Sequence, residues 1–148
     1  MNGDAHSTAL AYLRAHNVMT LATHSTWAAA VFYASDGFTL YFLSSPSSRH
    51  ARDLAEDPRA AAAIHEDYRD WRAIQGIQLA GTVERLEGES REAALASYGE
   101  KFGFVRTEPA LAATLAKAGC YRLAPSEVHF IDNAAGFGTR TRISHLSR

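Results

Sequence analysis

Asp36-Gly37 separates two runs of strand-forming residues, 27–35 and 38–43. A tight turn between antiparallel strands requires positive φ angles, which aspartate and glycine tolerate better than most residues. In the second run the side chains alternate between the two sides of the backbone, with Phe38, Leu40 and Phe42 on one side and Thr39, Tyr41 and Leu43 on the other. The pattern predicts a β-hairpin, so the fold contains antiparallel strands.

Further stretches on both sides of this hairpin favour strands, namely residues 18–24, 59–65, 74–86, 127–132 and 141–146. In the longest of them, Gly76 and Gly81 predict a bulge or a close approach of another group to the backbone. The alanine-rich stretch is ambiguous, because Asp57-Pro58 followed by four alanines is also typical of a helix start. We interpret it as a buried strand because it is short and lies between other strands.

Four helices are expected, opened by Ser7, by the serine-rich loop 44–48, by Ser90 and by Glu108-Pro109. They are expected to end near His16, Glu56, Phe102 and Gly119. These helices are inserted among six or seven strands and do not alternate with them. This order predicts an α+β, mainly β, fold: an antiparallel barrel with flanking helices.

Length and composition exclude several classes of protein. With 148 residues the chain fits one domain, spanning residues 1–148, and 15 basic against 16 acidic residues give no overall attraction for nucleic acid. A single cysteine, Cys120, excludes an intrachain disulfide, and we expect it to be a small buried apolar residue. No apolar run approaches the roughly 20 residues that cross a membrane, and no signal peptide is evident, so we expect a cytoplasmic protein.

The loop before the second helix carries the clearest candidate binding site. Ser44, Ser48, Arg49 and His50 lie between the end of a strand and a helix N-terminus, with further serines among them. A helix N-terminus presents unpaired N–H groups, and an arginine can grip two oxygens of a phosphate. The pattern indicates an anion site, although a serine-rich helix cap on a wet loop has the same appearance.

Two other features could contact a flat ligand. Gln75 and Gln78 carry amides that donate and accept hydrogen bonds, as the edge of a heterocycle requires, but they also suit the outward face of a strand. Phe137 lies between glycines and could cover a ring, meet a partner or plug its own core. No histidine shows ligand spacing, so we expect no metal site. Motifs for acyl transfer, P-loops and dinucleotide-binding folds are absent from the sequence.

Taken together, several segments resemble the pyridoxamine 5'-phosphate oxidase-like FMN-binding split-barrel superfamily. The segments that carry the resemblance are Leu21-Ala22-Thr23, Leu40-Tyr41-Phe42-Leu43-Ser44, Ser48-Arg49-His50 with Leu54, Asp57-Pro58-Arg59 and Ile77-Gln78-Leu79-Ala80-Gly81-Thr82-Val83. The resemblance covers residues 18–86 and returns near residues 130–142. Asp132-Asn133 and Gly136-Phe137-Gly138 are similar to a bacterial branch that is distinct from the oxidase itself.

The resemblance implies a six-stranded split barrel that forms a homodimer and binds two FMN molecules at the subunit interface. It implies a set of cofactor-binding residues: Phe32, Phe42, Leu43 and Ser44 on and after the flavin-facing strands, Ser48, Arg49 and His50 at the phosphate, and Gln75 and Gln78 at the ring. It also implies an FMN-dependent oxidoreductase that acts on a small or flat substrate. No residue stands out as the catalytic acid or base.

This sequence departs from the oxidase at three places. Phe32 or a neighbour replaces a lysine on the flavin-facing strand, His50 replaces a phosphate-binding lysine, and residues 138–142 do not reproduce the substrate-binding Arg-x-His motif. Oxidation of pyridoxamine phosphate itself is therefore not expected. Three alternatives stay open: a haem-binding or haem-degrading barrel with His129 or His145 as axial ligand, a non-catalytic flavin-binding or stress protein, and a deazaflavin in place of FMN.

Overall fold

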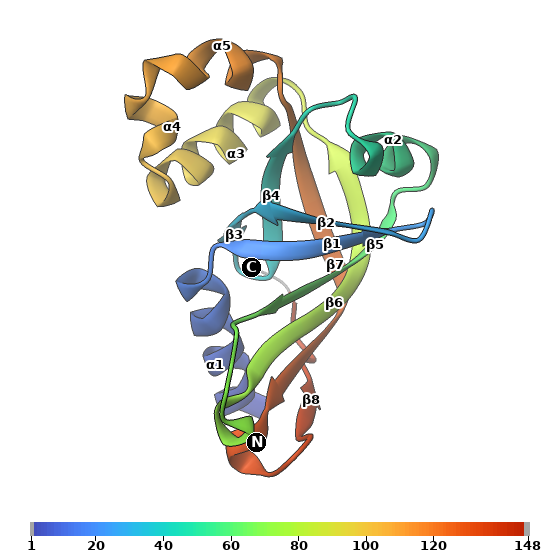
Figure 1. The fold of residues 1–148 in the computed structure, drawn as a ribbon, viewed down its shortest axis with the longest axis vertical. Coiled ribbons are helices and arrows are strands. Elements are labelled where there is room, and N and C mark those ends of the chain that lie inside the picture. Colours follow the sequence, from blue (N-terminus) through green and yellow to red (C-terminus); the bar gives the residue numbers. More distant parts are fainter. Residues whose placement is uncertain (1, 147–148) are drawn as a thin grey trace.

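The computed structural model describes residues 2–146 and contains one antiparallel sheet of eight strands with helices around it (Figure 1). The strands are β1 (Val18–Thr23), β2 (Trp27–Phe32), β3 (Ala34–Asp36), β4 (Thr39–Ser44), β5 (Arg59–His65), β6 (Gln75–Arg85), β7 (Gly119–Asp132) and β8 (Arg140–Arg142). The helices are α1 (Asn2–Ala15), α2 (Arg49–Glu56), α3 (Gly88–Lys101), α4 (Phe104–Thr107) and α5 (Pro109–Lys117), with single 3₁₀ turns at Trp71–Ala73 and Asn133–Ala135.

The sheet closes on itself through the covalent chain. Its strand order is β2-β1-β5-β6-β7-β4-β3, with β8 paired to β7, so β2 and β3 form its two ends. These two strands are consecutive in sequence and only Tyr33 lies between them. The sheet must therefore curl until its ends meet, and no ladder of hydrogen bonds joins them among the described residues. This arrangement confirms the predicted mainly β, antiparallel split barrel with flanking helices.

The number of strands differs from the expected six. We predicted one strand over residues 27–35, but Tyr33 interrupts it. The Tyr33 side chain is fully buried, its hydroxyl donates to Leu13 O at 2.7 Å and its N–H donates to Asn17 O at 3.0 Å. Tyr33 therefore leaves the ladder to bind the end of α1 and the residues that follow it, and the run splits into β2 and β3. The closing strand expected at 141–146 is shorter and begins earlier, as β8.

The hairpin is confirmed. Asp36 pairs with Thr39, and Gly37 adopts a φ of 59° in the turn. Phe38, Leu40 and Phe42 are all buried in the barrel interior. The alternation that predicted the hairpin thus also identified its core-facing side.

β6 and β7 run side by side along the length of the molecule (Figure 1). The sequence predicts only the second half of β7, residues 127–132, whereas the strand begins at Gly119 and contains Pro125, a residue that is rare inside strands. The register shifts at Ala80 and Gly81, and Gly81 faces Pro125 there. This irregularity confirms the bulge or close approach predicted for Gly81, and it accommodates a residue that cannot donate to the ladder.

The helix caps were predicted with mixed success. Ser48 caps α2, its Oγ accepting from Ala51 N at 3.3 Å, and α5 begins at Pro109 as expected. Ser7 and Ser90 are not caps, because α1 and α3 begin before them, and α4 was not expected.

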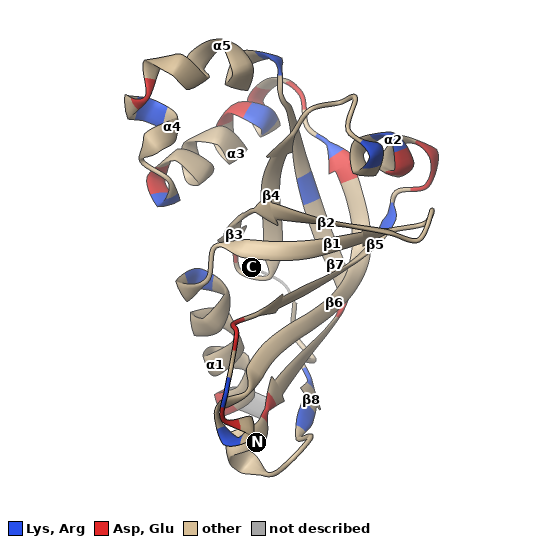
Figure 2. Cartoon of the chain, viewed as in Figure 1, with Lys and Arg blue, Asp and Glu red and all other residues tan. Residues whose placement is uncertain are grey.

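None of the helices in residues 2–146 is long and apolar enough to cross a membrane. Figure 2 shows charges of both signs on α2 and α3.

The main core fills the barrel interior. It contains residues of α1, α2 and every strand except β2, β3 and β8, among them Leu13, Met19, Leu21, Leu54, Ile64, Ile77, Leu123 and Val128. Ala51 and Leu54 of α2 belong to it, so this helix closes one end of the barrel. Cys120 is 1% exposed, which confirms the expectation of a buried apolar residue.

Lys101 of α3 makes the stability of the protein depend on pH. Its amino group donates to His16 O and lies 4.2 Å from the centroid of the Tyr33 ring, and burial lowers the pKa of Lys101 to about 8. An unfolded lysine has a pKa of about 10.4, so the unfolded chain holds this proton more tightly. The folded state is therefore penalised below about pH 8, and the penalty fades as the pH rises toward 10.

We expect wild-type protein to gain stability relative to Lys101→Met between about pH 7 and about pH 9.5. Urea denaturation of both proteins at several pH values measures this difference, and the comparison cancels the titration of tyrosines and Cys120. The other lysine of the sequence, Lys117, is exposed, so Lys117→Met serves as the matched control. A Lys101→Met difference that stays constant over this range contradicts the expectation.

Candidate functional site

The loop between β4 and α2 is folded by its own serines. Ser48 N and Ser48 Oγ both donate to Ser45 O, at 3.0 and 2.8 Å, and Ser45 Oγ lies 2.8 Å from Ser47 Oγ. Within the described residues the backbone N–H groups of Arg49 and His50 have no acceptor. The first turn of α2 therefore presents two free donors and the positive end of the helix dipole.

His50 lies at the same place but is not suited to supply a positive charge. Burial lowers the pKa of His50, although the nearby Asp53 carboxylate acts in the opposite direction. Its Nε2 lies 2.6 Å from Ser44 Oγ and 3.4 Å from Ser48 Oγ. The imidazole therefore acts in the loop as a neutral hydrogen-bonding group.

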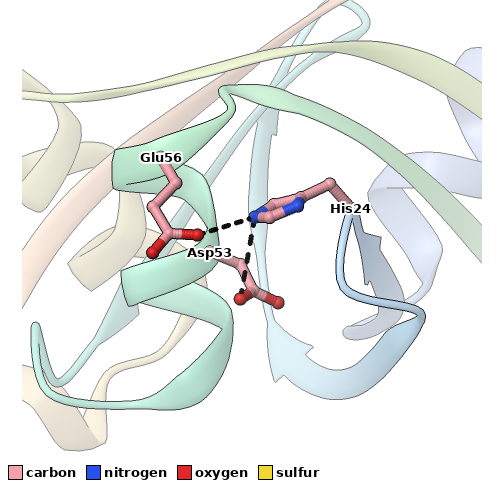
Figure 3. Close-up of side chains that lie close together, drawn as sticks. All are labelled: His24, Asp53 and Glu56. Carbon is pink, nitrogen blue, oxygen red and sulfur yellow. Dashed lines mark ion pairs between the residues drawn. The ribbon is translucent and has the colours of Figure 1, made fainter.

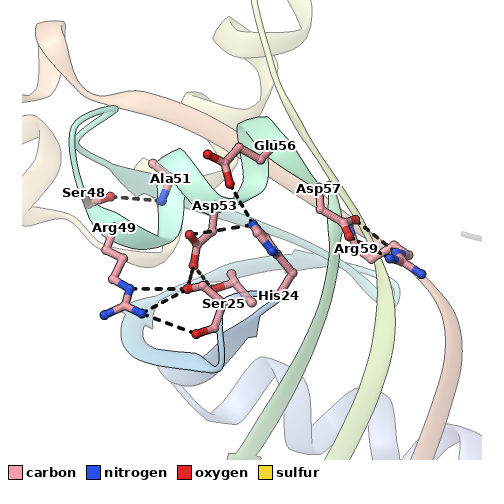
Figure 4. Close-up of polar contacts among 10 residues, drawn as sticks. His24, Ser25, Ser48, Arg49, Ala51, Asp53, Glu56, Asp57 and Arg59 are labelled. Atoms are coloured by element: carbon pink, nitrogen blue, oxygen red, sulfur yellow. Dashed lines mark hydrogen bonds and ion pairs between the residues drawn. The ribbon is translucent and has the colours of Figure 1, made fainter.

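Arg49 is the exposed cation of this loop. Its Nε and Nη2 donate to Ser25 Oγ at 3.3 Å (Figure 4). Its guanidinium carbon lies 4.4 Å from the centroid of the Trp27 ring. Ser25 and Trp27 come from the turn that joins β1 and β2 and from the start of β2. The guanidinium is thereby held beside the mouth of α2, and Nη1 has no partner within residues 2–146.

Asp53 connects α2 to the end of β1 and the β1–β2 turn through hydrogen bonds. It is 8% exposed, and its Oδ2 accepts hydrogen bonds from Thr23 Oγ1 at 2.7 Å and from Ser25 Oγ at 2.5 Å. The hydrogen bonds from Ser25 and Thr23 hold the pKa of Asp53 below its usual range, with smaller contributions from His24 and Arg49. The sequence analysis missed Asp53; a carboxylate beside the core-facing Leu54 was the signal available.

The outward face of β1, β5 and β6 carries small side chains. Strand pairing places Ala22, Ala61 and Ala80 in one row and Thr20, Ala63 and Gln78 in the next. Five of these six residues are exposed, and Ala63 is half-buried. A surface of this kind allows a flat ring or a second sheet to approach the backbone closely.

A pocket lies at the far end of this face, and Gln75 and Gln78 are among its lining residues. The pocket has a volume of about 180 Å³ and also includes Ala63, His65, Gly76 and Ile131. Gln78 pairs across the sheet with His129, whose Nε2 is 2.5 Å from Glu127 Oε2. The distance from this pocket to α2 follows from the strand pairing. Gln78 and Thr23, which contacts Asp53 of α2, are separated by two strand spacings and by three residues along β1, which corresponds to roughly 14 Å.

Within one chain, the structure places the other predicted site residues neither at the first turn of α2 nor at the glutamine pocket. Phe32 is 49% exposed, and its ring contacts Phe102 at a centroid distance of 5.2 Å. Phe42 is fully buried and stacks on Tyr121 at 5.1 Å, so its side chain belongs to the core. Leu43 is half-buried against the cluster beneath α3.

Phe137 lies at the opposite end of the molecule from α2. Its ring is 80% exposed and packs edge-on against Trp71, with centroids 5.7 Å apart. This exposure excludes the interpretation of Phe137 as a plug in its own core. Asn133 holds the surrounding loops together, since its amide donates to Trp71 O at 2.9 Å and its carbonyl accepts from Gly138 N at 3.0 Å.

Comparison of the sequence with protein families gives a match to the model described as pyridoxamine 5'-phosphate oxidase, over residues 5–132. Among curated proteins, the UPF0306 protein plu4501 of Photorhabdus laumondii is 32% identical over 134 residues, covering 87% of this chain and 88% of that protein. The match therefore extends over nearly the whole length of both chains.

Solved structures share the fold. A haem-binding protein from Mycobacterium smegmatis superposes with a TM-score of 0.76 at 28% identity, covering 93% of this chain and 57% of that one. The chain thus spans little more than half the length of that protein. An FAD-binding protein from Mesorhizobium loti superposes with a TM-score of 0.64 at 17% identity, covering 84% of this chain and 90% of that one.

Proposed function

Because this chain belongs to the pyridoxamine 5'-phosphate oxidase family, we propose that it is a flavoprotein that binds FMN at a homodimer interface. We further propose that it is an oxidoreductase acting on a small or flat substrate. The observation that carries the proposal is the exposed face of small residues on β1, β5 and β6, which ends on one side at the pocket that Gln75 and Gln78 line and approaches the mouth of α2 on the other.

The phosphate end of the cofactor would lie at α2. The free N–H groups of Arg49 and His50 suit phosphate oxygens, and the Arg49 guanidinium adds a charged donor. Ser48 caps the helix and keeps this turn in place. Since His50 is neutral, Arg49 is the cation of this loop on which phosphate binding depends.

The ring end would lie near the glutamines. Bound FMN supplies the redox chemistry through its isoalloxazine ring. The reduced ring gathers negative charge near N1 and C2=O, and an amide donor there stabilises that state. Gln78, exposed on the outward face, is the residue we assign to this contact, with Gln75 beside it in the pocket.

The same face is the surface through which we expect two chains to associate. Exposed alanines on neighbouring strands let a second copy come close, and the exposed Phe32 and Val18 at its edge add apolar area. In a dimer the residues that lie apart in one chain, such as Phe32 and Arg49, could face one cofactor from both sides. Light scattering of the FMN-loaded protein measures its molecular mass and therefore the number of chains in the assembly, and a monomer contradicts the proposal.

We expect Arg49→Ala to weaken FMN binding about 10- to 100-fold, because a charged hydrogen-bond donor to phosphate is worth about 1.5–3 kcal/mol. Binding of riboflavin, which lacks the phosphate, is expected to change little. Quenching of flavin fluorescence in a titration measures both affinities, after circular dichroism has confirmed that the variant folds.

Arg52→Ala is the matched control, since Arg52 is an exposed arginine of the same helix. It should leave both affinities near their wild-type values. An Arg49→Ala variant that binds FMN as tightly as wild type, or that loses FMN and riboflavin equally, removes Arg49 from the phosphate site.

Haem binding is the second candidate, and the similarity to the Mycobacterium smegmatis haem-binding protein favours it. His129 is half-buried beside Gln78 on the outward face, where it could serve as an axial ligand, while His145 lies near the C-terminus and its carbonyl accepts from His6. A Soret band from the purified protein, lost in His129→Ala, would identify this function in place of flavin binding.

Two further measurements distinguish the proposed FMN-dependent oxidoreductase from a non-catalytic flavin-binding protein and from a protein that binds a deazaflavin. Bound FMN that NAD(P)H cannot reduce, with no turnover on any acceptor, indicates a non-catalytic flavin-binding or stress protein. A mass spectrum of the molecule that co-purifies separates FMN from a deazaflavin.

A further inference from the structure

Three side chains with metal-binding atoms converge between the β1–β2 turn and α2, and Figure 3 shows them facing one another. His24 Nε2 lies 3.2 Å from Glu56 Oε2 and 3.8 Å from Asp53 Oδ1. The three donor atoms all fall within 4.8 Å of one another. We propose that His24, Asp53 and Glu56 form a binding site for a divalent transition-metal ion, with zinc as the best fit.

The 3.2 Å between the donor atoms of His24 and Glu56 agrees with the spacing in a metal centre, and the 3.8 Å from His24 to Asp53 is somewhat longer. Tetrahedral zinc with bonds of about 2.0–2.1 Å places neighbouring ligand atoms about 3.3 Å apart. The side chains of His24 and Glu56 are 34% and 73% exposed, so small rotations can bring them to these bond lengths. The three ligands leave one coordination position open toward solvent.

The charges around the cluster also favour a cation. One imidazole, even when protonated, can balance only one of the two carboxylates. Within residues 2–146, Asp53 and Glu56 form no ion pair except with His24. Neither nearby arginine forms an ion pair with these carboxylates, because Arg49 donates to Ser25 and Arg59 pairs with Asp57 (Figure 4), although the charge of Arg49 contributes to lowering the pKa of Asp53.

The orientation of Asp53 adds to the argument. Its side chain is 11% exposed, and two hydroxyls hold its Oδ2. Its Oδ1 accepts no hydrogen bond from the described residues and is aimed at His24 at 3.8 Å, which is too long for a hydrogen bond. In metal sites, hydrogen bonds from surrounding groups commonly hold a ligand carboxylate in the orientation that binding requires. The hydroxyls of Thr23 and Ser25 hold Asp53 in this way.

The donor set selects the metal. An imidazole with two carboxylates suits zinc and other first-row transition ions, whereas magnesium and calcium prefer oxygen ligands alone. The ligands come from both the β1–β2 turn and α2, so a bound ion would clamp the helix whose first turn carries the proposed phosphate site. The metal proposal nevertheless stands on its own residues and does not require FMN.

The test uses the full chain without a histidine tag, freed of metal with EDTA and then dialysed. Calorimetric titration with zinc chloride is expected to show one ion bound per chain. His24→Ala and Glu56→Gln are each expected to weaken binding at least about ten-fold, since each removes one of three ligands. Zinc at 100-fold above its Kd is expected to raise the melting temperature by about 5–10 °C.

His65→Ala is the matched control, because His65 is an exposed histidine on β5 outside the cluster. It should keep the wild-type affinity. Cobalt offers a second readout, in which a strong visible absorption band indicates tetrahedral binding and should vanish in His24→Ala. The proposal is overturned if wild type binds no zinc in the micromolar range, or if His24→Ala binds as tightly as wild type; the cluster is then a surface ion pair only.

Discussion

Phe42→Ala is expected to lower the free energy of unfolding by about 3–5 kcal/mol, the cost of removing a large aromatic side chain from a packed core. Phe42 is fully buried, stacks on Tyr121 and belongs to the main core of the barrel. The surrounding strands are paired on both sides, so they cannot collapse into the cavity. Urea denaturation followed by circular dichroism measures the loss.

The control for this prediction is Phe137→Ala, because the Phe137 ring is 80% exposed. It should change the free energy of unfolding by no more than about 0.5 kcal/mol. A milder variant, Phe42→Leu, separates the core from the cofactor. If Phe42 contacts flavin only through its backbone, Phe42→Leu will retain wild-type FMN affinity, and a ten-fold loss with an intact fold would assign the side chain to the cofactor.

Gly81→Ala is expected to destabilise the protein by about 3 kcal/mol or more. A Cβ at this position would lie 2.2 Å from Ala124 O and 2.7 Å from Pro125 Cα, both of which are backbone atoms. The clash cannot be relieved by rotating a side chain, so β6 and β7 would have to separate at the bulge. Thermal and urea unfolding measure the effect.

Gly103→Ala is the matched control, since a Cβ at Gly103 would meet nothing within 4 Å and the residue already has helical φ and ψ angles. It should be neutral or stabilise the protein by about 0.5–1 kcal/mol. If Gly81→Ala proves as mild as Gly103→Ala, the close packing of β6 on β7 is not needed for stability.

Much of the fold could be predicted because its signals are local. A positive φ at Gly37 and the hydroxyl cap of Ser48 each act on the backbone within a few residues. Gly81 was visible because a glycine inside a strand indicates a bulge or a close approach, although the backbone that it approaches, at Ala124, is distant in sequence. The failures had distant causes. The first half of β7 was not predicted, and Tyr33 divided a run that looked continuous, because in both cases a segment far away in sequence determined the backbone path.

The candidate sites show the same division. The serine loop and Arg49 were visible in sequence because they are contiguous with a helix start. His24, Ser25 and Glu56 gave no signal, and Asp53 gave only its position beside the core-facing Leu54, since roughly 30 residues separate the two groups. A histidine metal site was not expected, because no spacing along the chain brings these ligands together.

The amino-acid sequence alone was sufficient to specify the hairpin, the cap of α2 and an antiparallel barrel, because turn, cap and alternation energies act between near neighbours. Gly81 indicated a close approach, and the tertiary structure supplied its partner on β7. Only the tertiary structure decided that Asp53 would anchor α2 to the β1–β2 turn and that His24 and Glu56 would meet beside it. That meeting depends on how far the whole sheet curls, which is the summed result of packing across every strand of the barrel.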